Sequence, residues 1–335
     1  MSSPPSNTSG HPSLQASVII PSWGRGRLLA KTLAALAAQP QPETFEVLVV
    51  ENGSREALPL QEVYPNFRFF WLESRGVSAA RNLGIRNARA SLLIFLDDDV
   101  TTAAGFVAAH VRAHQGATKQ VIIGDLRFVV DEQCACSGIS IQAQEAGGAA
   151  EKLRGARHEC GVLDFPAGNF SIESQLLMDV GGFDESFDPH GGLEELDLAL
   201  RLQEAGARFF FDPGPVGTHI GMGTESYYYD KLKLTGRNQV QMLMKYGPHA
   251  PHVRSAFLVR GYTVPRAVWG RRVLQHAPFL FDAISSLSRV AAKAPGLRHS
   301  RLASLDHRLK QFRAFWSGAC EVMGWQELER TICEH

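Results

Sequence analysis

Three consecutive aspartates, Asp97, Asp98 and Asp99, directly follow an apolar run at residues 92–96. Adjacent negative charges repel one another, and the repulsion raises their proton affinity unless a cation shares the site. Mg²⁺ and Mn²⁺ prefer oxygen ligands, commonly one or two carboxylates together with the phosphates of a substrate. Alternate residues of an extended segment point the same way, so Asp97 and Asp99 can face one ion while Asp98 turns towards a ribose or a backbone amide. The triplet therefore predicts a site for a metal ion or a nucleotide.

Two other roles fit the same triplet. Carboxylates are favoured at the amino-terminal end of a helix, and a helical pattern follows at residues 103–114. The segment DDDVT also matches the DxDxT pattern of haloacid-dehalogenase-like phosphatases, in which Asp97 would be the nucleophile and Asp99 an acid and base. The strand with that pattern is normally the first of such a phosphatase domain, whereas three predicted strands precede the strand that leads into Asp97 here. This order weakens the phosphatase interpretation.

Short apolar runs alternate with helical patterns along the first part of the chain. The predicted strands cover 16–21, 45–50, 67–72, 92–96 and 120–124, and the predicted helices cover 27–39, 76–90 and 103–114. This alternation predicts a doubly wound, Rossmann-like α/β fold with a mainly parallel sheet flanked by helices. Ligands of such sheets gather at the carboxyl ends of the strands, where the aspartates lie. The segment 125–160 has weak periodicity, and we expect irregular structure there.

A further predicted helix at 193–206, followed by a strand at 207–212, carries adjacent acids in its first turn. The helix dipole alone favours acids at this place, so some of them could be purely structural. Glu195 shares its helical face with apolar residues at the i+3, i+4 and i+7 positions, whereas Glu194 shares a more polar face with Asp197. Glu195 is therefore predicted to be the acid that points inward.

The composition is that of a soluble globular protein. Lys+Arg and Asp+Glu number 34 each in 335 residues, so no overall charge indicates a nucleic-acid partner. The five cysteines show neither a disulfide framework nor paired CxxC spacing, which favours a reducing compartment. Residues 1–13 lack the pattern of a signal peptide, and no later run approaches the ~20 apolar residues that span a bilayer. We expect a cytoplasmic protein.

Six segments occur in the order found in family 2 glycosyltransferases. They are VIIPSWGR (18–25), VLVVENGS (47–54), RGVSAARNLGIRNARASLLIFLDDDV (75–100), GGFDESF (181–187), EELDLALRLQEAG (194–206) and PGPVGTHIGMGTES (213–226). The sequence resembles this family over roughly residues 14–226. The resemblance implies a GT-A fold, a nucleotide-diphospho-sugar donor, a divalent metal cofactor (Mn²⁺ or Mg²⁺) and inverting transfer to an acceptor hydroxyl.

The resemblance also implies roles for individual residues. It implies nucleotide-sugar binding by Pro21, Ser22, Glu51, Asn52, Arg81 and Asp98, metal binding by Asp97, Asp99 and His219, and an acceptor side at Asp184, Gly168 and Asn169. It implies that Glu195 is the general base, and Glu194 is the second candidate for that role. The family usually has aspartate where Glu51 and Glu195 stand, so each contact would lie about one methylene further out.

Two other function classes stay open. The departures at Glu51 and Glu195 permit a non-catalytic homologue that binds nucleotide-sugar or glycan without turnover. A nucleotidyltransferase would need a nucleoside triphosphate and usually a Gly-rich basic loop after its first strand, of which PSWGRGR at 21–27 is a faint echo. Donor hydrolysis or transfer would exclude the binding-only class.

The chain is predicted to divide into a disordered leader (1–13), a GT-A domain (14–230) and a basic helical region (231–335). In the last of these, 17 Lys and Arg oppose 6 Asp and Glu. Residues 260–293 mix Arg with aromatic and aliphatic side chains, as an interfacial helix on anionic lipid would. That contact would place the protein at the inner face of a membrane. A basic cap packed on an acidic catalytic domain fits the charges equally well.

Overall fold

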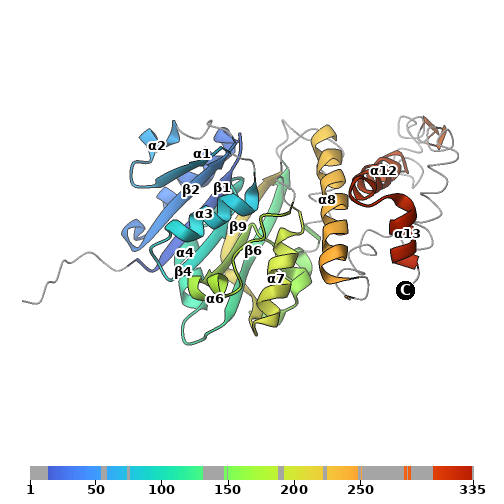
Figure 1. Cartoon of the computed structure of the whole chain (residues 1–335). Coiled ribbons are helices and arrows are strands. Elements are labelled where there is room, and N and C mark those ends of the chain that lie inside the picture. Colours follow the sequence, from blue (N-terminus) through green and yellow to red (C-terminus); the bar gives the residue numbers. More distant parts are fainter. Residues whose placement is uncertain are drawn as a thin grey trace, which may run out of the picture.

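The computed structural model describes most of the chain up to residue 250 and a helical segment near the carboxyl end. The described residues are 14–53, 59–73, 76–130, 147–148, 150–187, 192–221, 225–247, 250, 283–284, 286–287 and 305–333. They form one large sheet covered by helices, with the last helices of the chain beside it (Figure 1).

The sheet has nine strands in the order β3-β2-β1-β4-β8-β6-β9-β5, and β7 pairs with β9 outside this path. The strands are β1 (Ala16–Ser22), β2 (Phe45–Asn52), β3 (Arg68–Leu72), β4 (Leu92–Leu96), β5 (Val100–Thr102), β6 (Gln120–Val130), β7 (His158–Cys160), β8 (Asn169–Glu173) and β9 (Arg208–Gly221). Strands β1 to β4 run parallel, and β6 pairs parallel with β9, whereas β5, β7 and β8 are antiparallel to their neighbours. The predicted α/β fold with a mainly parallel sheet is confirmed.

Helices cover both faces of this sheet. The helices are α1 (Gly26–Ala37), α2 (Leu60–Val63), α3 (Val77–Asn87), α4 (Phe106–Ala113), α6 (Ser174–Asp179), α7 (Glu194–Glu204), α8 (Glu225–Tyr246), α12 (Leu305–Val322) and α13 (Trp325–Cys333). Alternate residues of β1 point to opposite faces, so Ile19 packs in one core with α3, α6 and α7, whereas Val18 and Ile20 pack in another with α1 and α4. Gly84 allows α3 to lie directly on β1, because a Cβ there would come within 2.4 Å of Ile19.

Three predicted boundaries need correction. Strand β6 continues to Val130, so the first part of the segment expected to be irregular is regular sheet. Strand β9 runs to Gly221 instead of ending at residue 212, and it stays paired with β6 across an irregularity between Gly124 and Asp125. Pro21 lies near the end of β1, where β1 still pairs with β2. The pairing of β1 with β4 covers only residues 17–19, so the missing N–H of Pro21 removes no hydrogen bond to β4.

The carboxyl-terminal helices belong to the same core as the sheet. Val240 and Leu243 of α8 and Phe315 and Trp316 of α12 are buried in one cluster with Phe95 of β4. Helix α8 stands between the sheet and α12 (Figure 1), and its first residue precedes the predicted boundary at 231. The predicted interfacial segment 260–293 lies almost entirely outside the described residues. Among the helices that the structure describes, none combines the length and the apolar character needed to cross a bilayer.

Candidate active site

The aspartate turn (Asp97–Asp99) connects the carboxyl end of β4 with β5. His219 reaches it from β9, where it pairs with Val100, the first residue after the turn. The carboxylates of Asp97 and Asp99 and the imidazole of His219 place ligand atoms within 4.8 Å of one another. Nε2 of His219 lies 3.3 Å from Oδ1 of Asp99. The structure thus brings together the three residues that the sequence predicted as metal ligands.

The donor set of this cluster fits a divalent cation. Two carboxylates and one imidazole suit Mn²⁺ or Mg²⁺, since hard cations take oxygen ligands and a neutral imidazole is an accepted neighbour. The Asp97 side chain is 32% exposed, which leaves the cluster open on one side. Nδ1 of His219 is buried, and no described residue forms a hydrogen bond with it. The ring is therefore held by packing, including a contact with Phe128 at 5.1 Å between ring centroids.

Arg25 forms ion pairs with two carboxylates of the aspartate turn, although the sequence did not mark it as a site residue. Its Nη1 donates to Oδ2 of Asp99 at 2.6 Å and to Oδ1 of Asp98 at 3.3 Å. Its Nη2 donates to the hydroxyl of Tyr227 on α8 at 2.8 Å. Burial acts against the charge of Arg25, but the attraction of Asp98 and Asp99 is larger and raises its pKa. In this structure a guanidinium therefore balances the charge of the turn.

Asp98 turns away from the metal-ligand cluster. It is 5% exposed, and its backbone carbonyl accepts a hydrogen bond from Oγ1 of Thr32 on α1 at 2.9 Å. The pKa of Asp98 is raised to about 7, because burial and, to a smaller extent, the neighbouring Asp99 outweigh the opposing effect of Arg25. Asp98 is not among the clustered ligand atoms, but its buried carboxylate shares Arg25 with Asp99, and its predicted turn towards a ribose or a backbone amide stays a prediction.

The other predicted nucleotide residues lie at the ends of β1 and β2. Glu51 is fully buried; its Oε1 accepts from the N–H of Gly24 at 3.2 Å, while Oε2 finds no partner within the described residues. Asn52 is used internally: its amide donates to the carbonyl of Ser22 at 2.8 Å and accepts from the N–H of Gly76 at 3.1 Å. Glu51 thus has one carboxylate oxygen that no described residue engages, whereas Asn52 ties β1 to the start of α3.

Arg81 links the aspartate turn to the acids of α7. Its Nη1 donates to Oε1 of Glu194 at 2.9 Å and its Nη2 to Oδ1 of Asp97 at 3.3 Å, while its guanidinium lies 5.0 Å from the ring centroid of Phe183. The Arg81 side chain is only 4% exposed. Arg81, which the resemblance places in the donor pocket, is therefore bonded to two carboxylates of the protein in this structure. The guanidinium of Arg25 is more accessible.

Glu194 and Glu195 form an unequal pair at the start of α7. Burial opposes the charge of Glu194, but Arg81 and a 2.5 Å hydrogen bond from the N–H of Gly192 lower its pKa below the usual value. Burial and the neighbouring Glu194 raise the pKa of Glu195 to about 8. Oε2 of Glu195 is buried and, as far as the described residues show, has no hydrogen-bond partner. The pair therefore combines a fixed carboxylate with a carboxyl group that can exchange a proton near neutral pH.

The helical periodicity of α7 misjudged which face is buried. Glu194 and Asp197 were placed on the more polar face, yet they are 3% and 0% exposed, and Glu195 is the more accessible of the adjacent acids. Ion pairs explain the difference: Asp197 contacts Arg201 at 2.7 Å and Lys245 at 2.6 Å. A charged face can be buried when each charge meets a partner.

The predicted acceptor-side residues separate into different environments. A Cβ at Gly168 would lie 2.7 Å from Oδ2 of Asp97, so the glycine lets the chain pass beside the aspartate turn. Asn169 is fully buried; its amide oxygen contacts Nε2 of His110 at 3.0 Å and its amide nitrogen donates to the carbonyl of Pro215 at 2.9 Å. In this conformation Asn169 therefore cannot contact an acceptor substrate, as the resemblance implied, and it links β8 to α4 and β9 instead. Asp184 lines a cavity between α3, α6 and α7.

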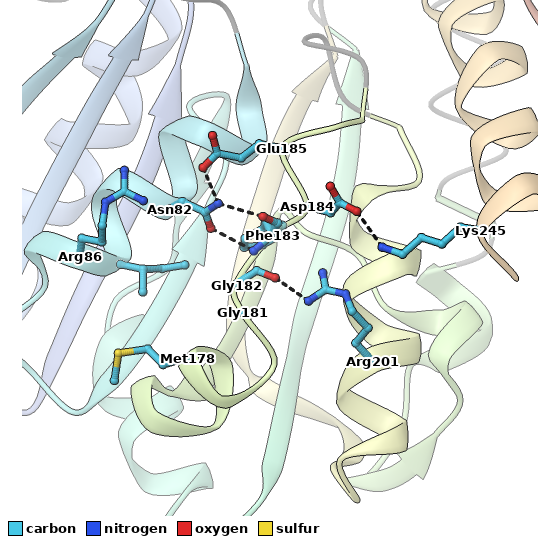
Figure 2. A pocket seen from close by; sticks show the side chains of 11 residues that line it. Asn82, Arg86, Met178, Gly181, Gly182, Phe183, Asp184, Glu185, Arg201 and Lys245 are labelled. Atoms are coloured by element: carbon cyan, nitrogen blue, oxygen red, sulfur yellow. Dashed lines mark hydrogen bonds and ion pairs between the residues drawn. The ribbon is translucent and has the colours of Figure 1, made fainter. Parts of the chain in front are cut away.

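That cavity has a volume of about 640 Å³ and lies between α3, α6 and α7 (Figure 2). Figure 2 shows Asn82 holding one wall: its amide donates to the carbonyl of Phe183 and to Glu185, at 2.8 Å and 2.7 Å. Lys245 donates to Asp184 at 2.7 Å on the opposite side. Along α7, Arg201 in the cavity lies six residues after Glu195, a rise of about 9 Å.

Sequence comparison connects this site with known proteins. A model of the family described as Glycosyl transferase family 2 matches residues 17–136. Glycosyltransferase AglE of Haloferax volcanii is 32% identical over 286 residues, which cover 76% of this chain and 89% of that protein. The uncharacterized glycosyltransferase YfnE of Bacillus subtilis (strain 168) is 26% identical over 256 residues, which cover 62% of this chain and 64% of YfnE. The chain thus spans less than two thirds of the length of YfnE.

Solved structures share the fold. Mannosyltransferase PcManGT from Pyrobaculum calidifontis, in complex with GDP-Man and Mn²⁺, superposes with a TM-score of 0.57 at 16% identity and covers 94% of this chain and 88% of its own. S. aureus TarS 1–349 in complex with UDP has a TM-score of 0.51 at 18% identity and covers 91% and 90%. At these identities the similarity establishes the architecture, and the arrangement of side chains described above is a property of this chain.

Proposed function

Because the chain belongs to glycosyl transferase family 2, we propose that it is a metal-dependent, inverting glycosyltransferase that moves a sugar from a nucleotide-diphospho-sugar to an acceptor hydroxyl. The observation that carries the proposal is that one arginine, Arg81, donates hydrogen bonds both to Asp97, a predicted metal ligand, and to Glu194, the neighbour of the predicted base. Such a junction sets the leaving-group side and the acceptor side of one reaction at a fixed separation.

The leaving-group side is formed by Asp97, Asp99 and His219, which would hold the divalent cation. A bound cation supplies charge neutralisation for the departing diphosphate. The solved complex of PcManGT with GDP-Man and Mn²⁺, a protein of the same fold, supports this assignment. The buried Oε2 of Glu51 lacks a partner among the described residues and would accept a hydrogen bond from the base or the ribose of the donor.

Glu195 is the base in this proposal. In an inverting displacement the acceptor oxygen attacks from the side opposite the leaving diphosphate, and its proton must pass to a nearby group. Among the described residues Oε2 of Glu195 has no hydrogen-bond partner, whereas Glu194 is held by Arg81 and Gly192, so Glu194 is the positioning residue and Glu195 the proton acceptor. Glu195 must first lose its own proton, which its raised pKa makes dependent on pH.

The cavity of Figure 2 is the proposed place for the part of the acceptor beyond the reacting hydroxyl. It combines exposed apolar surface at Met178 with acidic and amide groups at Asp184, Glu185 and Asn82, a mixture that suits polyhydroxylated ligands. Its Arg201 lies about 9 Å along the axis of α7 from Glu195, a distance that an acceptor extending past the reacting group would bridge. The basic region 231–335 remains a proposed contact for anionic membrane or a cap on the catalytic domain, and cytoplasmic localisation remains a prediction.

The test is sugar transfer or donor hydrolysis by purified protein. We expect Asp99→Ala and Glu195→Gln each to lower the rate by at least a factor of about 100, because each removes a group that acts on a developing charge. Wild-type rates in both variants would disprove the residue assignment. Binding of donor without hydrolysis or transfer by the wild type would instead support a non-catalytic homologue.

A further inference from the structure

We propose that Arg25 is the resident counter-cation of the aspartate turn, and that its guanidinium passes from Asp99 to the donor diphosphate when a divalent cation binds. In this way Arg25 makes the affinity for the cation depend on the presence of the nucleotide. The inference rests on the proposed function, because it concerns the same metal and donor site.

The contacts of Asp99 provide the first argument. Oδ2 of Asp99 accepts from Nη1 of Arg25 at 2.6 Å, and Oδ1 faces Nε2 of His219 at 3.3 Å. Side chains of the protein therefore engage both oxygens of this carboxylate. A cation that binds at Asp99 has to compete with Arg25, which also contacts Asp98.

The partial exposure of the Arg25 side chain provides the second argument. Its backbone carbonyl accepts the N–H groups of Leu28 and Leu29 at 2.9 Å and 3.0 Å, so its Cα is fixed at the start of α1. Its side chain is 33% exposed, in contrast to the 4% of Arg81, which two acids and Phe183 enclose. Arg25 can therefore swing towards an incoming ligand without any movement of the backbone.

The charges provide the third argument. Arginine stays protonated at every physiological pH, so a divalent cation and Arg25 repel each other when both lie beside Asp99. A diphosphate supplies several negative oxygens, and the planar guanidinium binds such oxygens with two parallel hydrogen bonds. The cation and Arg25 can share the site once the diphosphate is present. The structure thus predicts weak cation binding alone and tight binding together with nucleotide, which is a positive coupling between two ligands.

Tyr227 positions Arg25 for this exchange. Its hydroxyl accepts from Nη2 at 2.8 Å, and the ring centroid lies 5.9 Å from the guanidinium carbon. Tyr227 lies on α8, whereas Arg25 lies at the start of α1, so the contact also ties the two helices across the rim of the site. Loss of the hydroxyl should loosen Arg25 while its charge is kept.

The experiment measures Mn²⁺ affinity by calorimetry, first with Mn²⁺ alone and then with GDP or UDP present. For Arg25→Met we expect Mn²⁺ alone to bind about tenfold more tightly than to the wild type, a difference of about 1.4 kcal/mol. We also expect the tightening produced by the preferred nucleotide to shrink by at least tenfold. Lys31→Met is the matched control, since Lys31 is exposed on the same helix, and it should leave both quantities unchanged.

Further variants keep the proposal falsifiable if Arg25→Met does not fold. Arg25→Gln should show the same gain in Mn²⁺ affinity, and Tyr227→Phe should show a smaller gain in the same direction. Weaker or unchanged binding of Mn²⁺ alone in folded Arg25 variants would overturn the proposal, as would a wild type that binds no Mn²⁺ even with nucleotide. None of these measurements requires sugar transfer. Loss of turnover with intact coupling would therefore count against Glu195 or the acceptor assignment and not against Arg25.

Discussion

Glu195→Gln combined with a pH series tests the proposed base in the greatest detail. Burial and the neighbouring Glu194 raise the pKa of Glu195 to about 8. Only the charged carboxylate can accept a proton, so activity must rise as the pH climbs through this value. With a pKa one unit above neutrality, about one tenth of the molecules carry charged Glu195 at pH 7. We therefore expect kcat/KM at pH 7 to be roughly one tenth of its plateau above pH 9.

The same pKa predicts an effect on folding that does not depend on catalysis. The pKa of Glu195 is raised from 4.5 to about 8, so the folded chain binds the proton of this carboxyl group more tightly than the unfolded chain does. The resulting stabilisation is fully present below pH 4.5 and is lost as the pH rises through about 8. The difference between the two pKa values corresponds to at most about 5 kcal/mol, and partial exposure of the side chain reduces it. Glu195→Gln binds no proton and should show no such loss.

The two effects are measured on the same proteins. Initial rates give kcat/KM between pH 5.5 and 9.5, and urea titrations give the free energy of unfolding over the same range. Glu195→Gln should lose activity by a factor of about 10² to 10⁴ at every pH and should gain stability relative to the wild type as the pH rises. Glu204→Gln, an exposed acid on the same helix, should match the wild type in both assays. A flat pH profile for the wild type, or unfolding energies of wild type and Glu195→Gln that run parallel, would refute the reasoning.

Two further substitutions test the donor and acceptor sides. Glu51→Ala removes a buried carboxylate of which one oxygen has no partner in the part of the chain that the structure describes. We expect the affinity for the preferred nucleoside diphosphate, measured by calorimetry, to fall about tenfold or more while Mn²⁺ affinity alone is kept. Unchanged nucleotide affinity would show that Glu51 does not contact the donor. Glu185→Ala removes the partner of Asn82 at the wall of the cavity in Figure 2, and steady-state kinetics should show a higher KM for the acceptor with an unchanged KM for the donor. A rise in the donor KM alone would place the acceptor elsewhere.

The fold and the aspartate turn were predictable because their signals are local. Apolar runs of four to eight residues that alternate with helical patterns define the strands of a parallel sheet. The carboxyl end of β4 places Asp97 and Asp99 at the functional edge whatever the distant contacts are. The length of β9 was missed because Pro213 and Gly214 read as a turn, whereas the pairing with β6 continues past them through an irregularity at Gly124.

The environment of single side chains was not predictable because it depends on partners far apart in the sequence. Arg25 contacts Asp99 at a separation of 74 residues and Tyr227 at 202, and no local pattern marks such an ion pair. Glu194 is buried because Arg81, 113 residues earlier, neutralises it. The family resemblance placed Asn169 on the acceptor side, yet its amide oxygen contacts His110, 59 residues earlier. The sequence thus predicted where these residues lie in the fold, whereas the exposure of their side chains depends on tertiary contacts.

The central claim is tested most directly by donor hydrolysis with a panel of GDP- and UDP-sugars, because water replaces the acceptor of unknown identity. Wild type and Asp99→Ala are each assayed with EDTA and then with Mn²⁺ in excess. We expect the wild type to hydrolyse one group of nucleotide sugars, EDTA to abolish this activity and Mn²⁺ to restore it, and we expect Asp99→Ala to stay inactive throughout. Undiminished hydrolysis in EDTA, or by Asp99→Ala, would contradict a cation held by the aspartate turn and His219.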